Sequence, residues 1–169
     1  LPFFFLFLAI NFYLCTKLRI LIYYILSSDY LKYWRVIRQY IKVKYGLTQS
    51  DLDILLFLNT EGYFDKDKFL EFDRILSWDE QRFDNLLRDG WIEVFRKRKG
   101  KTKGLYMLSY KSKRVITSIY KKLDGEEIPT SPSQNRMFLK NVSYTDKRYR
   151  EAIENMNSFI RQQRHLSPE

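Results

Sequence analysis

The first candidate for chemistry in the sequence is a run of cationic side chains between residues 96 and 103. The run contains no acidic residue and six cations: Arg96, Lys97, Arg98, Lys99, Lys101 and Lys103. Charges of one sign at this density repel one another unless a polyanion or salt screens them, and phosphate backbones are the commonest polyanion to meet such a surface. The run therefore predicts a contact with nucleic acid; the alternative is a solvated charged turn.

Residues that support catalysis are scarce. A nucleophile needs an activating base nearby, yet the only histidine, His165, is close to the C-terminal end and the only cysteine, Cys15, lies in an apolar segment. These two residues form neither a metal cluster nor a disulfide within the chain. We therefore expect no enzyme, no metal and no cofactor, and a cytoplasmic protein.

Two short β-prone segments flank the basic run. Residues 91–95 (WIEVF) follow Gly90, and residues 105–108 (LYML) follow Gly104. This pattern predicts a hairpin that carries the cations between its strands, as in the wing of a winged-helix protein.

The chain has 169 residues and a net charge of +10, which suits one basic domain. Residues 1–28 are an apolar leader in which Lys17 and Arg19 follow the apolar run, whereas a secretory signal places its charges first. The run from Pro2 to Cys15 is shorter than the roughly 20 residues of a membrane-spanning helix, so a membrane is not expected as a partner. Upstream translation, a membrane anchor and a dimer-interface helix stay open for this leader. We assign residues 29–169 to the folded domain.

The periodicity of apolar residues predicts the helices that position the hairpin. Residues 31–45 form an amphipathic helix, and a capping box at Thr48 and Asp51 opens an apolar helix over residues 52–58. Asp65 is expected to cap a short helix through residue 75. Ser77, with Glu80 three residues later, is expected to cap a helix over residues 78–88 that leads into the hairpin.

Two further helices are predicted after the hairpin, over residues 112–123 and 145–161, with a linker between them. The first and last helices are amphipathic and flank the core, so we expect them to form a homodimer interface. The alternative is that the last helix packs on its own domain. The expected interface residues are Trp34, Ile37, Ile41, Tyr149, Ile153, Met156, Phe159 and Ile160.

This order of elements resembles the MarR-type winged-helix transcription regulators over about residues 29–163. The likeness is carried by the run LSWDEQRFDNLLRDGWIEVFRKRKGKTKGLYMLSYKSKR, with its Ser-capped helix, its L-x-x-x-G-W-I exit from Leu86 to Ile92 and its basic wing. The resemblance implies a mainly α fold with a small β-hairpin wing, a winged helix-turn-helix with N- and C-terminal dimerisation helices. It also implies a homodimer that binds double-stranded DNA through a recognition helix at about residues 78–88 and a wing at residues 96–103. The implied recognition-helix contacts are Ser77, Glu80, Gln81, Arg82 and Asn85.

Two departures from the family pattern leave an alternative to sequence-specific DNA binding open. The wing has Lys101-Thr102-Lys103 where the family usually has an Asp-x-Arg pair, and acids outnumber bases on the expected recognition helix. An acidic helix disfavours phosphates, so the rival hypothesis is a winged-helix protein-assembly module without sequence-specific DNA binding. A small-molecule effector is also left open.

Overall fold

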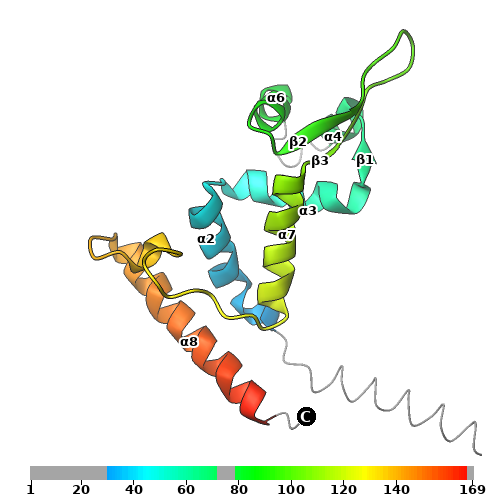
Figure 1. Cartoon of the computed structure of the whole chain (residues 1–169). Helices are drawn as coiled ribbons and strands as arrows, with labels where there is room; N and C mark the ends of the chain where they lie inside the picture. The colour runs from blue at the N-terminus through cyan, green and yellow to red at the C-terminus, as the bar shows by residue number, and fades with distance from the viewer. Residues whose placement is uncertain (1–29, 72–78, 167–169) are drawn as a thin grey trace, which may run out of the picture.

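The computed structural model describes residues 30–71 and 79–166, and Figure 1 shows their arrangement. The elements in chain order are η1 (Tyr30–Tyr33), α2 (Trp34–Tyr45), α3 (Gln49–Glu61), β1 (Tyr63–Phe64), α4 (Lys66–Leu70), α6 (Glu80–Arg88), β2 (Ile92–Arg96), β3 (Leu105–Leu108), α7 (Tyr110–Leu123), η2 (Arg136–Phe138) and α8 (Tyr144–Leu166). The sheet, α4 and α6 lie at one end, α2 and α7 lie in the middle, and α8 runs alongside α2 (Figure 1). The apolar leader at residues 1–28 lies outside the described residues.

Local capping signals set the starts of α3 and α4. The Thr48 hydroxyl accepts a hydrogen bond from the backbone N–H of Asp51, and the Asp51 carboxylate accepts one from the backbone N–H of Thr48. Asp65 caps α4 because its Oδ1 accepts from the backbone N–H of Lys68 at 2.8 Å. Both caps were expected from the sequence and are confirmed.

The predicted start of α6 needs a correction. The sequence predicts a Ser77 cap, whereas α6 begins at Glu80 with Asp79 as its N-cap. The Asp79 carboxylate accepts a hydrogen bond from the backbone N–H of Arg82 at 2.8 Å. A carboxylate at the N-cap adds an attraction to the positive end of the helix dipole that a hydroxyl lacks, which favours the later start. Ser77 itself lies outside the described residues.

The basic hairpin belongs to a three-stranded antiparallel sheet of order β1-β3-β2. Strands β2 and β3 form the predicted hairpin, with Ile92 opposite Leu108. Strand β1 pairs with the other edge of β3, with Tyr63 opposite Met107. The sequence does not predict β1, because two residues are too few to show the alternation that marks a strand.

Aromatic rings pack the inner face of this sheet onto the helices. The rings of Phe64 in β1 and Tyr106 in β3 lie 6.3 Å apart, and Phe83 of α6 meets Tyr106 edge to face at 4.8 Å. Phe69 of α4 contacts Phe83 at 5.0 Å, again edge to face. Phe64, Phe69 and Phe83 are all buried, so this cluster fixes the root of the hairpin on α4 and α6.

The apolar stripes of α2 and α8 pack within one chain. Five of the residues expected at a dimer interface are fully buried: Ile37, Ile41, Ile153, Met156 and Ile160. The reason is that the segment between α7 and α8 folds α8 back against α2, so the structure places these five in the intramolecular core and leaves no area on them for a second chain. The other three are partly buried: Trp34, Tyr149 and Phe159.

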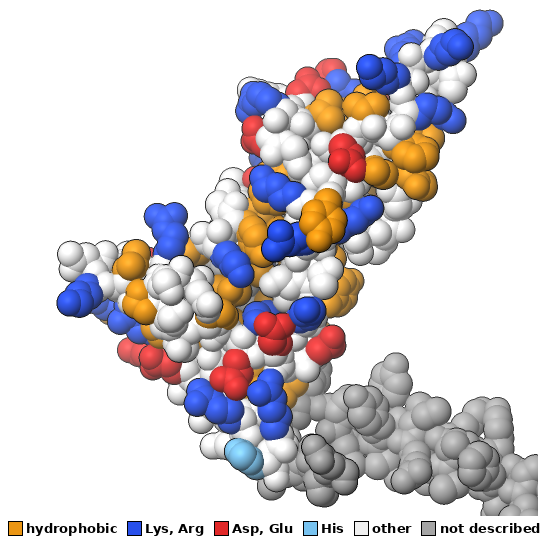
Figure 2. All heavy atoms as spheres, in the orientation of Figure 1, with side chains coloured by type: hydrophobic (Ala, Val, Ile, Leu, Met, Phe, Trp, Pro, Cys, Tyr) orange, Lys and Arg blue, Asp and Glu red, His pale blue; other side chains and the backbone are white. Residues whose placement is uncertain are grey.

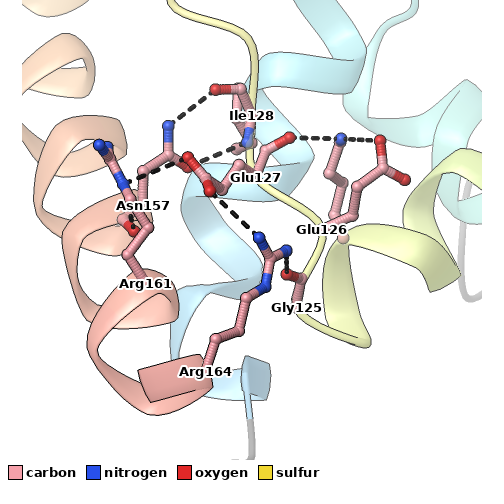
Figure 3. Close-up of polar contacts among 8 residues, drawn as sticks. Gly125, Glu126, Glu127, Ile128, Asn157, Arg161 and Arg164 are labelled. Atoms are coloured by element: carbon pink, nitrogen blue, oxygen red, sulfur yellow. Dashed lines mark hydrogen bonds and ion pairs between the residues drawn. The ribbon is translucent and has the colours of Figure 1, made fainter.

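Polar contacts hold the segment after α7 against α8, as Figure 3 shows. The Asn157 side chain accepts a hydrogen bond from the N–H of Ile128 at 2.9 Å and donates one to its carbonyl at 2.8 Å. Arg164 donates to the Gly125 carbonyl at 2.9 Å and lies 3.3 Å from the Glu127 carboxylate. The backbone of this segment therefore obtains its partners from α8.

Both helices after the hairpin are longer than predicted. Helix α7 begins at Tyr110 because the Ser109 hydroxyl accepts from the backbone N–H of Ser112 and caps it. The hydroxyl of Ser143 accepts a hydrogen bond from the backbone N–H of Asp146 at 3.1 Å, and α8 continues to Leu166. Within residues 30–71 and 79–166, no helix has the length and apolarity needed to cross a membrane.

The Asn157 contacts predict a site-specific loss of stability. Replacing Asn157 by Ala leaves the buried N–H and carbonyl of Ile128 without partners, at a cost of about 2–4 kcal/mol in the free energy of unfolding. Urea denaturation measures this loss. Asn155→Ala is the matched control, since Asn155 is exposed on the same helix, and a change within about 0.5 kcal/mol is expected for it. Equal effects of the two substitutions would contradict the assignment.

Candidate nucleic-acid interface

The tip of the hairpin is a tight turn that projects from the body of the molecule (Figure 1). Lys99 and Thr102 form an isolated antiparallel bridge, with backbone N–H to carbonyl distances of 3.2 and 3.0 Å. Gly100 adopts a φ of 56°, a left-handed conformation that glycine enters without a steric cost. The two residues between the bridged pair, Gly100 and Lys101, therefore lie at the tip.

Five wing cations are exposed and have no carboxylate within ion-pair distance among the described residues: Arg96, Lys97, Arg98, Lys99 and Lys101. The Arg96 side chain donates a hydrogen bond to the Lys103 carbonyl at 3.5 Å. Figure 2 shows these Lys and Arg side chains gathered along the projecting hairpin. The hairpin is thus a dense positive surface that the rest of the described chain does not neutralise.

Lys103 differs from the other wing cations because it is paired inside the chain. Its ammonium lies 2.7 Å from the Asp67 carboxylate and 3.3 Å from that of Asp65, both at the start of α4. The hydrogen bonds to Asp67 and Asp65 raise the pKa of Lys103 above its ordinary value. Lys103, which was expected to contact DNA, is 63% exposed, and through these two pairs it also ties the hairpin to α4.

Arg82 on the expected recognition helix is also paired inside the chain. Its guanidinium donates to the Asp51 carboxylate at 2.7 Å, and the side chains are 30% and 20% exposed. Asp51 therefore caps α3 and anchors α6 at the same time. This pairing directs the Arg82 guanidinium toward the start of α3.

The remaining expected contacts of α6 lie at its surface. Gln81 and Glu80 are exposed and Asn85 is half-buried, and Gln81 and Asn85 line an open cleft of about 320 Å³ between α6 and the start of α3. These three side chains are accessible at the surface of α6, and Arg82, which is 30% exposed, lines the same cleft.

Lys66 of α4 compensates part of the negative charge on α6. Its ammonium pairs with the Glu80 carboxylate and lies 3.5 Å from that of Asp84. The hydrogen bond to Glu80 is the main cause of the raised pKa of Lys66. Sequence reasoning missed this lysine because its partners lie more than ten residues further along the chain. Its position opposite an acidic helix face becomes visible only when α4 and α6 are packed together.

Sequence reasoning also missed an aromatic pair at the root of the hairpin. The rings of Tyr63 in β1 and Phe95 in β2 lie 4.3 Å apart, and both residues are more than half exposed. The alternation of side chains along β2 could have placed Phe95 on the outer face of the sheet. Its partner Tyr63 could not be found in this way, because the sequence does not predict β1.

Together these elements define the fold class. The chain is mainly helical, with α4 and α6 followed by a two-stranded basic hairpin that a third short strand completes, and this is a winged helix. The predicted fold class, a mainly α winged helix with a small β-hairpin wing, is confirmed.

Comparison with solved structures finds a cysteine-to-serine mutant of MarR from E. coli complexed with operator DNA. The two chains share 16% sequence identity, the match covers 72% of this chain and 81% of that chain, and the TM-score is 0.40. No protein-family model and no curated protein sequence matches this chain.

The cap at Asp65 makes the stability of α4 depend on pH. The backbone N–H of Lys68, followed by the Lys103 ammonium, holds the pKa of the Asp65 carboxyl below its ordinary value of 3.8. The carboxylate therefore contributes its full stabilisation above pH 3.8, and this contribution is lost as the pH falls through the lower pKa of the folded state.

Asp65→Asn tests this dependence, because asparagine also caps helices but carries no charge. At neutral pH we expect the variant to be less stable than the parent by at most about 1 kcal/mol, since the Lys103 side of the pair is exposed. Urea unfolding across an acid titration should show this difference shrinking toward zero. Glu154→Gln, at an exposed position of α8, is the control. A difference that stays constant with pH would exclude the proposed role of the charge.

Proposed function

We propose that this chain is a winged-helix transcription regulator that binds double-stranded DNA. The observation that carries the proposal is the hairpin with five cations that have no acidic partner among the described residues. Such a surface releases counterions when it meets phosphates, which supplies affinity that falls steeply with salt. The regulator acts by occupying DNA or by recruiting a partner to it, with no chemical step.

In the proposed complex the wing and α6 have different tasks. The wing cations hold phosphates, which sets affinity and orientation but reads no sequence. The accessible side chains of α6 face the base edges: Gln81 and Asn85 suit adenine, and Glu80 suits the amino group of cytosine. Arg82 supports this surface from behind through its pair with Asp51.

A homodimer is part of the proposal, because two subunits would present two recognition helices to a two-fold symmetric site. Only the accessible parts of Trp34, Tyr149 and Phe159 remain from the expected interface for a second chain to cover. Sedimentation equilibrium of the full chain tests this part of the proposal, and a monomer at all concentrations would remove it.

The first experiment measures the fluorescence anisotropy of a labelled duplex of random sequence across a salt series. For Lys99→Ala combined with Lys101→Ala we expect weaker binding to all sequences alike. The slope of log affinity against log salt should flatten by about one to two units, because two phosphate contacts are lost.

The matched control is Lys140→Ala combined with Lys147→Ala. It removes the same charge from exposed positions near the start of α8, far from the wing (Figure 1). An unchanged slope for the wing variant, or equal changes in both variants, would show that the wing makes no specific phosphate contact. Absence of duplex binding even at low salt would overturn the proposed function.

The acidic surface of α6 supports a second candidate, a protein-assembly module that docks a basic partner. Glu80 and Asp84 are exposed, and Lys66 is the one cation with which they form ion pairs among the described residues. In this alternative the wing only keeps the protein soluble.

Glu80→Gln combined with Asp84→Asn separates the two candidates. If α6 faces DNA, removing these two negative charges should tighten duplex binding roughly fivefold. The estimate takes about 0.5 kcal/mol of repulsion between each carboxylate and a phosphate about 8 Å away in water. The anisotropy assay measures this gain. Unchanged affinity would place α6 away from the DNA and favour the assembly module.

A further inference from the structure

The outer face of the small sheet carries two aromatic rings that the described chain does not cover. Tyr63 is 58% exposed and Phe95 is 52% exposed. Their ring centroids lie 4.3 Å apart with an interplanar angle of 39°, so they form one apolar platform. Two exposed rings in contact form a larger contiguous apolar patch than isolated aromatic side chains do.

The platform is not part of the core that holds the sheet on the helices. That task belongs to the opposite face, where Phe64 is 2% exposed and pairs with Tyr106. Successive side chains of a strand point to opposite faces, so Tyr63 points outward because Phe64 points inward. Packing within the described chain therefore does not explain why two aromatic rings lie on the outer face of the sheet.

The charges beside the platform restrict what can cover it. Phe95 directly precedes the run of unpaired cations that begins at Arg96, and Figure 2 shows hydrophobic and basic side chains adjoining at the root of the hairpin. Asp65, two residues after Tyr63, is already paired with Lys103. Two exposed acids lie nearby: Glu93, opposite Met107 and two residues before Phe95 on the same face, and Glu61, two residues before Tyr63. They are outnumbered by the five cations of the adjoining run.

These charges favour a partner that is anionic and presents flat apolar faces. A second copy of this chain fits poorly, since it would bring two unneutralised basic hairpins together. A nucleic-acid strand fits, because phosphates meet the cations while base faces meet the rings. In an intact duplex the base faces are covered by stacking, so the exposed faces must belong to unpaired bases.

We infer that Tyr63 and Phe95 form a stacking platform for unpaired nucleobases, with the wing cations holding the adjoining phosphates. The inference deepens the proposed function, since it rests on phosphate contacts by the same wing. It assigns the outer face of the sheet a ligand that double-stranded DNA does not present: a single-stranded or locally opened segment.

The test compares two ligands of equal charge, an oligothymidylate and an abasic oligonucleotide of the same length. The full chain should bind the oligothymidylate roughly tenfold more tightly or better, because only this ligand has bases to stack on the rings. Tyr63→Leu combined with Phe95→Leu keeps apolar side chains but removes the rings, and it should bind both ligands equally. Tyr120→Leu is the matched control, since Tyr120 is 52% exposed on α7, and it should keep the full preference.

A conservative variant guards against loss of folding in the double substitution. Phe95→Trp keeps a ring at the position, should retain the preference, and should show indole quenching by the oligothymidylate that the abasic strand does not produce. Equal binding of both ligands by the parent chain, or a preference that survives removal of both rings, would overturn the inference.

The outcomes also separate this inference from the proposed function. Salt-dependent duplex binding without any preference for bases over the abasic strand would overturn the platform and leave the regulator in place. Absence of binding to duplex and single strand alike would overturn both.

Discussion

Ion pairs between elements decide which charges of this winged helix are available to a partner. Lys103 is held by the acids at the start of α4, Lys66 is shared by two acids of α6, and Arg82 is held by the acid that caps α3. Each pair joins elements that are distant in the sequence, and together they fix the sheet, α3, α4 and α6 relative to one another. The hairpin carries a dense run of unpaired cations, and further exposed cations without an ion pair among the described residues lie on α2 and α7, for example Arg35, Lys113 and Arg114. The positive charge of the chain is therefore spread over several elements, and the hairpin differs from them by the density of its cations.

The parts of the fold that follow from local rules were predictable from the sequence. The capping box at Thr48 depends on two residues three positions apart, and the hairpin depends on two β-prone runs around a polar loop. The cap at Asp65 is equally local. Signals of this kind act over a single turn or a few residues, so the sequence contains them without any knowledge of packing.

The rest depends on contacts between distant elements, which no local pattern shows. Strand β1 exists because β3 offers it an edge, not because two residues prefer an extended conformation. The cations of the candidate site look alike in sequence, yet Lys103 is paired and Lys101 is not. The stripe of α8 was visible, but the same apolar pattern suits a partner helix in another chain or in the same one. Here α2 covers it.

The pair of hydrogen bonds between the Asn157 side chain and the backbone of Ile128 affects how α8 could exchange between two copies of this chain. A helix that exchanges between subunits must leave its own domain, and α8 cannot leave without freeing both backbone groups of Ile128 from their partners in a buried site. Its isoleucine and methionine side chains would lose their cover in the same movement. Exchange of α8 between two copies would therefore pass through a state in which these contacts are broken, which slows the exchange, although the α8 of the second copy would restore the same contacts once the exchange is complete.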